Sequence, residues 1–414
     1  MRPDMKLRSP LLLLALLCTG YALSFFHRVC PAVLAPELME AFKLDATSFS
    51  LISSATMLGY AVTQIPSGLL ADIMGGRRTM ALYQVLAGSF CIAFTFCGSM
   101  APAVFCRFLL GLTLACNVPA YKILAASVPA DRYAQYCSIL TGCSAVGTLL
   151  AASPLVALTN LVGWQIALLL AGIFTVLIGV AVFLLLEDSD CANSRDVPSP
   201  LENLRALKKG LYEVVHLKNF WLIFLWFMFM IGNMFVLLTT WWGSYLMEAN
   251  GLSKEATGLS LSIMSLGPLP LLVVVPWLSD NVFRSRRIFL LAAALLESAA
   301  LAYVCFSSSA LSFTELTVAG LSISAATTCM GPLSFTMVKE SVPSSALASA
   351  CGFLNCSGPV MAAVLQWLVG AVLTWQTNSG STVQGAYSCA FLLLLAGSLT
   401  ALAASLFMKD TLKR

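Results

Sequence analysis

Two stretches of the chain share one pattern of residues. They read GLLADIMGGRR (68–78) and PWLSDNVFRSRR (276–287). In each, a small or kinking residue is followed two positions later by Leu, two positions after that by Asp, and then by a basic cluster. Asp72 and Asp280 are 208 residues apart, and so are positions 11 and 219, where two long apolar stretches begin. This repeated spacing predicts a chain built from two duplicated halves.

The composition of the chain indicates a membrane protein. Apolar residues make up 59% of the 414 residues and charged residues 10%, whereas soluble domains contain about 45–50% and about 25%. A water-soluble core could not hide this much apolar surface, but a lipid bilayer can accommodate it. The net charge of +4 follows from how Lys and Arg are distributed about the membrane, so we expect no nucleic-acid partner.

Twelve stretches are long and apolar enough to cross a bilayer, which takes about 20 residues per helix. They do not alternate in polarity at every second residue, so they predict helices and not barrel strands. We therefore expect an all-α integral membrane protein of twelve transmembrane helices, arranged as two pseudo-symmetric six-helix bundles. The predicted spans are 11–35, 48–70, 79–98, 101–126, 135–160, 164–186, 219–247, 256–278, 287–307, 312–338, 347–373 and 384–408.

The longest polar segment divides these spans six and six. It predicts an N-terminal bundle (1–186), a central cytoplasmic loop (187–218) and a C-terminal bundle (219–414). With both termini in the cytoplasm, the cytoplasmic segments hold eighteen Lys and Arg residues, and the external loops hold only Lys43 and Lys254. Because Lys and Arg are retained on the cytoplasmic side, we expect a multi-pass protein of the inner (plasma) membrane with both termini cytoplasmic.

The segment 68–78 resembles the loop motif G-x-L-a-D-r-x-G-r-[KR] of the major facilitator superfamily, and segment 276–287 lies where that family keeps a degraded copy. The resemblance covers the whole chain, with Ile73 as a departure where the family has a basic residue. It implies a cytoplasmic latch between the halves, in which a carboxylate pairs with Arg and with a helix N-terminus of the opposite half. The alternative is that the basic residues only anchor the topology. The latch residues are Gly68, Asp72, Gly75, Arg77, Arg78, Asp280 and Arg284.

Two cations within the predicted helices are candidates for binding a substrate, because ionisable groups at bilayer depth are costly and usually functional. Arg28 follows His27 in a segment that resembles the first helix of the anion:cation symporter branch of the family, with His in the position of an acid. A guanidinium facing a central cavity would hold a carboxylate or phosphate by paired hydrogen bonds. Lys122 is a second candidate for this clamp. Either side chain could instead extend to the membrane surface.

Three further ionisable residues are candidates for proton coupling. His27 is the intramembrane group whose ordinary pKa is near neutrality, although a structural histidine is an alternative. Arg107 begins a match to the family pattern R-x-x-x-G-x-x-x-A in helix four, but Leu114 stands where the anion symporters have Glu. Glu297 lies among Ala and Leu residues in helix nine, where a carboxyl packed between helices is the alternative to a coupling role.

Uncharged residues also mark the predicted cavity, since the resemblance implies that helices one, four, seven and ten line the transport path. An aromatic side chain there can stack on a flat solute, but Trp241 could equally belong to an interfacial belt. The candidates are Tyr60, Asn233, Trp241 and Asn355.

The sequence contains no pattern typical of a catalytic site or an ATP-binding loop. Its fourteen Cys residues form no C-x-x-C pair, which favours helix packing over a metal site or a disulfide framework. We therefore expect no enzymatic activity, no cofactor and no metal. We expect a monomer in the lipid bilayer, with transport driven by a proton gradient. The first hypothesis is symport of a small organic anion with protons. The alternatives are proton-driven efflux of amphipathic compounds and a non-transporting sensor on the same fold.

Overall fold

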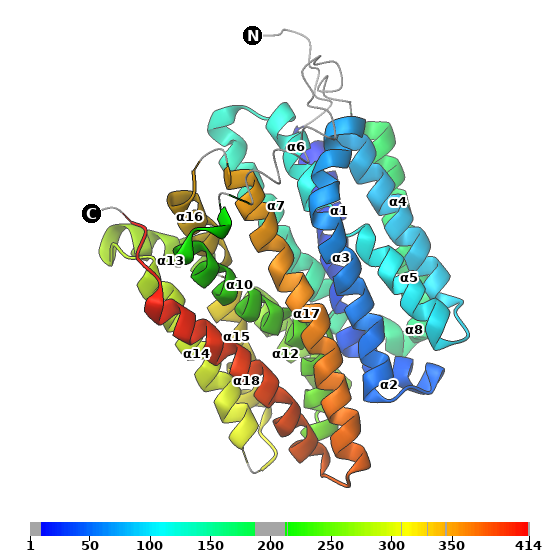
Figure 1. Cartoon of the computed structure of the whole chain (residues 1–414). Coiled ribbons are helices and arrows are strands. Elements are labelled where there is room, and N and C mark those ends of the chain that lie inside the picture. Colours follow the sequence, from blue (N-terminus) through cyan, green and yellow to red (C-terminus); the bar gives the residue numbers. More distant parts are fainter. Residues whose placement is uncertain are drawn as a thin grey trace.

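The computed structural model describes residues 10–186, 212 and 214–412, except positions 308, 329, 344 and 345. Within these residues the regular structure is helical and contains no strand (Figure 1). The all-α fold class predicted from the sequence is therefore confirmed. Most of the predicted loop 187–218 lies outside the described residues, so the boundaries of the two bundles stay a prediction.

The first half of the chain folds into eight helices. Cys30 separates the first two, and residues 113–116 separate α5 from α6, so two predicted spans are broken. The helices are α1 (Pro10–Val29), α2 (Pro31–Phe42), α3 (Ala46–Met74), α4 (Gly76–Thr95), α5 (Met100–Leu112), α6 (Asn117–Ser127), α7 (Ala130–Leu150) and α8 (Ser153–Leu185).

The second half repeats this plan and adds π-helical turns, in which one extra residue enters the helical repeat. Its elements are α10 (Lys218–Val236), η2 (Leu237–Trp241), α11 (Trp242–Ser244), η3 (Tyr245–Ala249), α12 (Lys254–Leu266), α13 (Leu271–Trp277), η4 (Leu278–Val282), α14 (Arg287–Phe306), α15 (Phe313–Thr328), α16 (Met330–Ser341), α17 (Leu347–Asn378) and α18 (Val383–Phe407).

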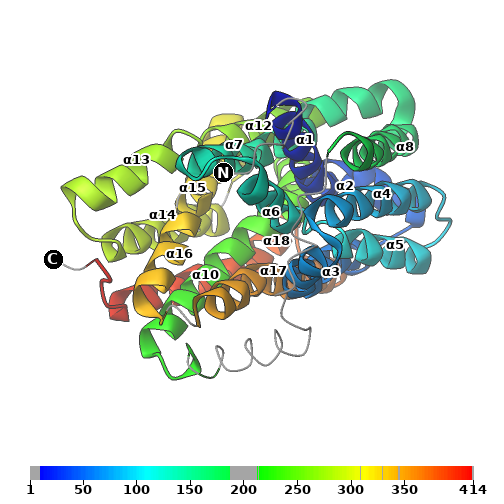
Figure 2. The ribbon, with the colours of Figure 1, turned by 90° about the horizontal axis from the view of Figure 1, so that it is seen from above.

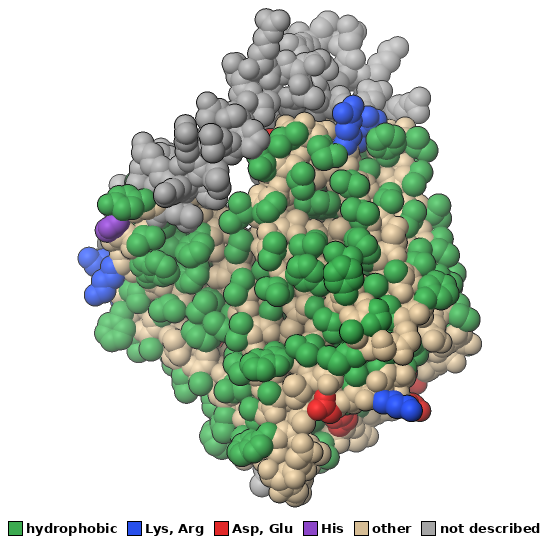
Figure 3. Space-filling view, turned by 45° about the vertical axis from the view of Figure 1, so that its right-hand side comes forward, with side chains coloured by type: hydrophobic (Ala, Val, Ile, Leu, Met, Phe, Trp, Pro, Cys, Tyr) green, Lys and Arg blue, Asp and Glu red, His purple; other side chains and the backbone are tan. Residues whose placement is uncertain are grey.

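The described helices are consistent with twelve membrane crossings. Nine helical stretches within the described residues are long and apolar enough to cross a bilayer. One of them, Gln135–Leu185, contains the non-helical Gly163, where the chain turns and a second crossing begins. The more polar helices α3 and α4 contain 29 and 20 residues, so each is long enough for one further crossing. Figure 3 shows a broad apolar flank, with the Lys, Arg, Asp and Glu side chains in view gathered toward its two ends.

The two halves meet along two seams. Helix α3 packs lengthwise against α17, and α12 packs against α7 and α8. Seen from above, α3, α17, α7 and α12 lie toward the middle of the molecule, whereas α4, α5 and α8 lie on one side and α14 on the other (Figure 2). Helices of both halves therefore surround the centre, where a transport path would run.

Close packing within the first half depends on a glycine of α7. A methyl group at Gly147 would lie 1.9 Å from the carbonyl oxygen of Ala22 in α1. We expect Gly147→Ala to destabilise the protein by roughly 2 kcal/mol, because overpacking forces the two helices apart. Thermal unfolding of the purified protein measures this effect as a lower melting temperature.

Gly142 is a matched control on the same helix, since nothing lies within 4 Å of a methyl group built there. We expect Gly142→Ala to leave the melting temperature unchanged or to raise it, because Ala is favoured over Gly in helices by about 1 kcal/mol. Equal melting temperatures for the two variants would show that α1 and α7 do not pack as closely as described.

Candidate functional site

A cavity of about 650 Å³ lies between the two halves. Side chains of α1, α3, α6 and α7 line it on one side, and side chains of α10, α12, α15, α16 and α17 line it on the other. Among the described residues of its lining, Arg28 is the one charged side chain, and no carboxylate is present. The lining of the first half is otherwise rich in tyrosine, amide and hydroxyl groups, whereas the second half contributes mainly apolar and hydroxyl groups.

The guanidinium of Arg28 is held between two aromatic rings. Its central carbon lies 4.1 Å from the ring centres of Phe25 and Tyr60, an arrangement that stabilises a cation. Its Nε donates to the Ser24 carbonyl at 3.2 Å, and its Nη2 donates to the Ser24 hydroxyl at 3.2 Å and to the Leu114 carbonyl at 3.4 Å. Its Nη1 is buried without a hydrogen-bond partner within the described part of the chain. Nη1 is therefore the nitrogen of Arg28 that no other residue bonds, and protein atoms cover it in this conformation.

The break between α1 and α2 determines where Arg28 lies. Pro31 has no N–H, so the carbonyl of His27, four residues earlier, cannot make its helical hydrogen bond. The Nη1 of Arg107 donates to this carbonyl at 3.2 Å, and the Arg107 guanidinium lies 4.3 Å from the ring centre of Phe94. Arg107 is therefore bound to the carboxyl end of α1, where the helix dipole favours a cation, and it does not line the cavity.

His27 lies on the side of α1 away from the cavity. Its Nε2 is 2.9 Å from the hydroxyl of Thr175 in α8, and its side chain is 1% exposed. Its Nδ1 is buried without a partner among the described residues. The structure therefore places His27 beside Arg28 in the sequence but outside the cavity lining, and its role in proton coupling stays a prediction.

Asn233 and Glu297 lie in the packing of the second half and not in the cavity. The Nδ2 of Asn233 donates to Glu297 Oε1 and to the Leu394 carbonyl, both at 2.9 Å. Both side chains are fully buried. The prediction that Asn233 lines the cavity was wrong, because this face of α10 packs against α18 and its amide reaches Glu297 of α14. Glu297 is not among the described lining residues of the cavity, and its role in proton coupling stays a prediction.

Trp241 also lies outside the cavity. Its indole N–H donates to the Gln366 carbonyl at 3.1 Å, and its ring lies edge-on to Phe49 with the ring centres 5.8 Å apart. The prediction of a position in the central cavity was wrong, because this side chain packs at the contact between the halves. Tyr60 and Asn355 do line the cavity, as predicted from the sequence.

Several residues that line the cavity were not predicted from the sequence. The Nδ2 of Asn355 donates to Gln64 Oε1 at 3.0 Å, a hydrogen bond that joins the two halves across the cavity. Gln64 follows Tyr60 by four residues and shares its helix face, a spacing that could have identified it. Phe25 could have been found in the same way, since it precedes Arg28 by three residues. Tyr21, Asn117 and Tyr121 also line the cavity.

Lys122 does not join Arg28 in a two-cation clamp. Its Nζ donates to Asp72 Oδ1 at 2.6 Å and to the Ala71 carbonyl at 2.7 Å. That prediction was wrong, because α6 presents this residue to the end of α3, where a carboxylate neutralises it. Asp72 is thus paired within its own half, and the predicted contact with the opposite half is not made in this conformation.

The other residues of the first motif lie in α3, in the turn after it and in the first turn of α4. Gly75 has a φ of 85°, which favours glycine, and it begins the turn into α4. Arg77 donates to the carbonyls of Phe183 and Leu186 at the end of α8, at 3.1 and 3.0 Å. Gly68 lies in α3, with Val118 of α6 in ordinary contact range, and Arg78 begins α4 beside Arg77.

The carboxylate of the second copy of the motif is also paired within its own half. Asp280 accepts from Arg286 at 2.7 Å, and Arg286 also bonds Glu340 at the end of α16 at 2.9 Å. Arg284 is exposed and has a φ of 48°. Asp280 is therefore paired within the second half, because the turn after η4 leaves Arg284 exposed and brings Arg286 back toward the carboxylates, and the role of these residues in a latch stays a prediction.

The halves are joined at the end predicted to face outward. Lys254 at the start of α12 forms an ion pair with Glu37 of α2 and donates to the hydroxyl of Thr159 at 3.0 Å. Beside this pair, Asn160 donates to Glu255 at 2.9 Å. These contacts join the two halves at this end, which is the end predicted to face outward.

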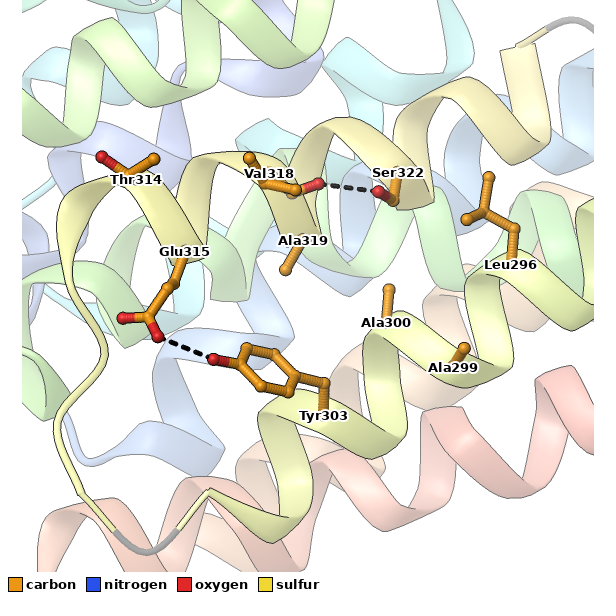
Figure 4. A pocket seen from close by; sticks show the side chains of 9 residues that line it. All are labelled: Leu296, Ala299, Ala300, Tyr303, Thr314, Glu315, Val318, Ala319 and Ser322. Atoms are coloured by element: carbon orange, nitrogen blue, oxygen red, sulfur yellow. Dashed lines mark hydrogen bonds between the residues drawn. The ribbon is translucent and has the colours of Figure 1, made fainter.

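A second hollow, of about 350 Å³, lies between α14 and α15 (Figure 4). Its lining is almost wholly apolar, and the Tyr303 hydroxyl donates to Glu315 at 2.8 Å at one end. All of its lining residues belong to the second half, so it lies apart from the path between the halves. The central cavity is therefore the candidate site.

The fold and the central cavity are those of a known family of membrane proteins. The family model of the Major Facilitator Superfamily matches residues 17–245, which is more than half of the chain. The chain therefore belongs to the major facilitator superfamily. A bacterial homologue of the human lysosomal transporter Spinster, in an inward-facing and unoccupied conformation, shares the fold with a TM-score of 0.76. That similarity covers 98% of this chain and 97% of that chain at 15% sequence identity.

Curated relatives match parts of the chain. The 4-hydroxybenzoate transporter PcaK of Pseudomonas aeruginosa is 24% identical over 60% of this chain and 61% of that protein. The hexuronate transporter of Escherichia coli is 27% identical over 39% of this chain and 37% of that protein. The membrane sensor protein UhpC of Salmonella typhimurium is 21% identical over 65% of this chain and 64% of that protein. The chain thus matches less than two thirds of the length of each of these relatives.

The Glu37–Lys254 pair should stabilise the conformation that is closed on the outer side. Each partner is partly buried, so Glu37→Gln or Lys254→Met should cost this conformation about 1 kcal/mol, roughly a fivefold shift in population. The native Cys351, which lines the cavity, reports the shift. Its labelling by an impermeant maleimide added outside, measured by peptide mass spectrometry, should become faster in either variant.

The double charge reversal Glu37→Lys with Lys254→Glu should restore slow labelling, because the pair is re-formed with opposite polarity. Glu40→Gln is the control and should leave the rate unchanged, since Glu40 lies three residues from Glu37 on the exposed surface of α2 and takes part in none of the contacts named above. Equal labelling rates in the parent and both single variants would exclude this pair as a stabiliser of the closed outer side.

Proposed function

We propose that this protein transports a small organic anion of the carboxylate type across the membrane by alternating access. The observation that carries the proposal is the single cation of the cavity, Arg28, with Nη1 left unbonded. An anion that binds there neutralises a charge surrounded by protein of low dielectric, where the attraction is much stronger than in water. A lipophilic cation would be repelled by the same charge, which argues against efflux of cationic compounds.

The geometry around Arg28 favours a carboxylate on a flat or compact body. Three of its five N–H groups are used by Ser24 and Leu114, so a carboxylate would bind at Nη1 and not along the full edge of the guanidinium. Phe25 and Tyr60 flank the cation, and Tyr21 and Tyr121 lie in the same lining. Aromatic side chains can stack on a ring and also contact a sugar face.

The names of the relatives support this substrate class. 4-Hydroxybenzoate and hexuronates, the compounds in two of those names, each carry one carboxylate on a six-membered ring or a six-carbon chain. Both fit the single-cation arrangement better than a compound with two or more negative charges would. Among such anions, we propose aromatic monocarboxylates first, because rings flank the cation on both sides.

We further propose that a proton gradient drives accumulation and that His27 takes part in the coupling. Within the described residues the cavity lining contains no acid, so a coupling proton needs another group near the bound anion. His27 is adjacent to Arg28 in α1 and has one ring nitrogen without a partner. The burial of His27 against Thr175 also fits a structural role. Replacement of His27 distinguishes the coupling role from the structural role.

The first experiment replaces Arg28. Arg28→Ala should raise the KM for uptake of a labelled aromatic monocarboxylate by about 10- to 100-fold, because a hydrogen bond to a charged group contributes about 1.5–3 kcal/mol. Arg28→Lys should have an intermediate effect, since it keeps the charge but loses the contacts that orient it. Uptake is measured in cells that express each variant at matched levels.

Lys122→Met is the matched control, because Lys122 is bonded to Asp72 and lies outside the cavity lining. It should leave KM within about twofold of the parent, since a side chain that does not contact the anion contributes little to its binding. Unchanged uptake in Arg28→Ala would end the proposal. Binding of the anion in a thermal-shift assay without any uptake would instead indicate a sensor, a role named for one relative.

The second experiment tests the proton. His27→Gln should abolish accumulation of the anion against a gradient while exchange of labelled for unlabelled anion continues, since binding and the change in access do not need the proton. Thr175→Val removes the hydrogen-bond partner but keeps the imidazole, so it should retain accumulation. Loss of both accumulation and exchange in His27→Gln would identify His27 as a structural residue.

A further inference from the structure

Two thiols lie side by side at the end of the molecule predicted to face outward. Cys97 follows the end of α4, and Cys106 lies in the second turn of α5, with their sulfur atoms 3.9 Å apart. Both side chains are partly exposed. Figure 1 shows the turn between α4 and α5 at the end of the bundle that carries α2. We propose that Cys97 and Cys106 are a site of disulfide formation at the outer face of the membrane.

The local backbone supports the approach of the two side chains. The N–H of Cys97 donates to the Phe94 carbonyl at 3.2 Å, which folds the chain back as α4 ends. Residues 98 and 99 then complete the turn, and α5 begins at Met100. The sulfur atoms, 3.9 Å apart, need to approach by about 2 Å to reach bonding distance.

The reaction is thiol–disulfide exchange with a small or protein disulfide, R–S–S–R, of the oxidising outer compartment. One cysteine loses its proton, and its thiolate attacks a sulfur of the oxidant, which forms a mixed disulfide and releases one R–S⁻. The second cysteine, also deprotonated, attacks the protein sulfur of the mixed disulfide and releases the second R–S⁻. The two cysteines are oxidised, and the oxidant is reduced to two thiols that take up the two protons.

The bond would cross-link the helices that hold Arg107 in place. Arg107 follows Cys106 directly, and its guanidinium lies 4.3 Å from the ring centre of Phe94, three residues before Cys97. The same guanidinium donates to the carbonyl of His27 at the break in α1. A link between Cys97 and Cys106 would therefore tie together the ends of α4 and α5 beside this contact and stabilise the first half of the protein.

Other cysteines of this half serve as internal controls. Cys30, Cys91 and Cys116 are buried in helix packing. The thiol of Cys91 donates to the Leu168 carbonyl, and the thiol of Cys116 donates to the Thr113 carbonyl. The acceptor is a backbone carbonyl in both cases and not another thiol. These three cysteines should stay reduced under conditions that oxidise the exposed pair.

The experiment uses the full chain in its membrane. Cells that express it are treated with oxidised glutathione and then acid-quenched, and free thiols are alkylated under denaturing conditions before peptide mass spectrometry. We expect a peptide pair linked through Cys97 and Cys106, about 2 Da lighter than the two reduced peptides together. Cys97→Ser and Cys106→Ser should each leave the remaining cysteine of the pair alkylated. Full alkylation of both cysteines after oxidation would overturn the proposal.

A second measurement tests the consequence of the bond. Reduction with a trialkylphosphine should lower the melting temperature of the oxidised parent but not that of Cys97→Ser, in which no bond can form. An equal response of the two proteins would contradict the stabilising role of the cross-link. Neither measurement uses transport, so the outcome is independent of the proposed function.

Discussion

The hydrogen bond from Arg107 to the carbonyl of His27 is the contact on which the site depends. In a bilayer no water is available to a backbone group that its own helix leaves unbonded, and Pro31 leaves this carbonyl unbonded. Arg107 supplies the missing donor and is stabilised in return by the carboxyl end of α1 and the ring of Phe94. The break can therefore persist at this depth, and it ends α1 one residue after Arg28.

The break between α5 and α6 obeys the same constraint. Pro119 cannot donate to the carbonyl of Ala115, and the hydroxyl of Ser67 donates to it at 3.1 Å instead. The neighbouring carbonyl of Leu114 accepts from Arg28. Backbone carbonyls and aromatic rings thus stabilise the two buried guanidiniums of this half where carboxylates would otherwise be needed. An acid beside Arg28 would neutralise the charge, whereas carbonyls and rings leave it available to an anion.

The two halves contribute unequally to the cavity although they repeat one plan. The first half supplies the cation and its flanking rings, and the second supplies an apolar and hydroxyl-bearing wall. A polar contact at the cavity, between Gln64 and Asn355, and an ion pair at the outer end, between Glu37 and Lys254, join them. These two contacts hold the halves together in this conformation.

The sequence by itself determined the membrane class and the repeated motif, and it identified Arg28 as a charge within an apolar helix. These follow from hydropathy and from the cost of a charge in lipid, which depend on composition along the chain and little on packing. Only the tertiary structure decided that Lys122 pairs with Asp72 and that Asn233 bonds Glu297. Spans that are apolar on every face carry no periodic signal of which side meets lipid, helix or cavity. The direction of a polar side chain therefore depends on the neighbouring helix, which the local sequence does not specify.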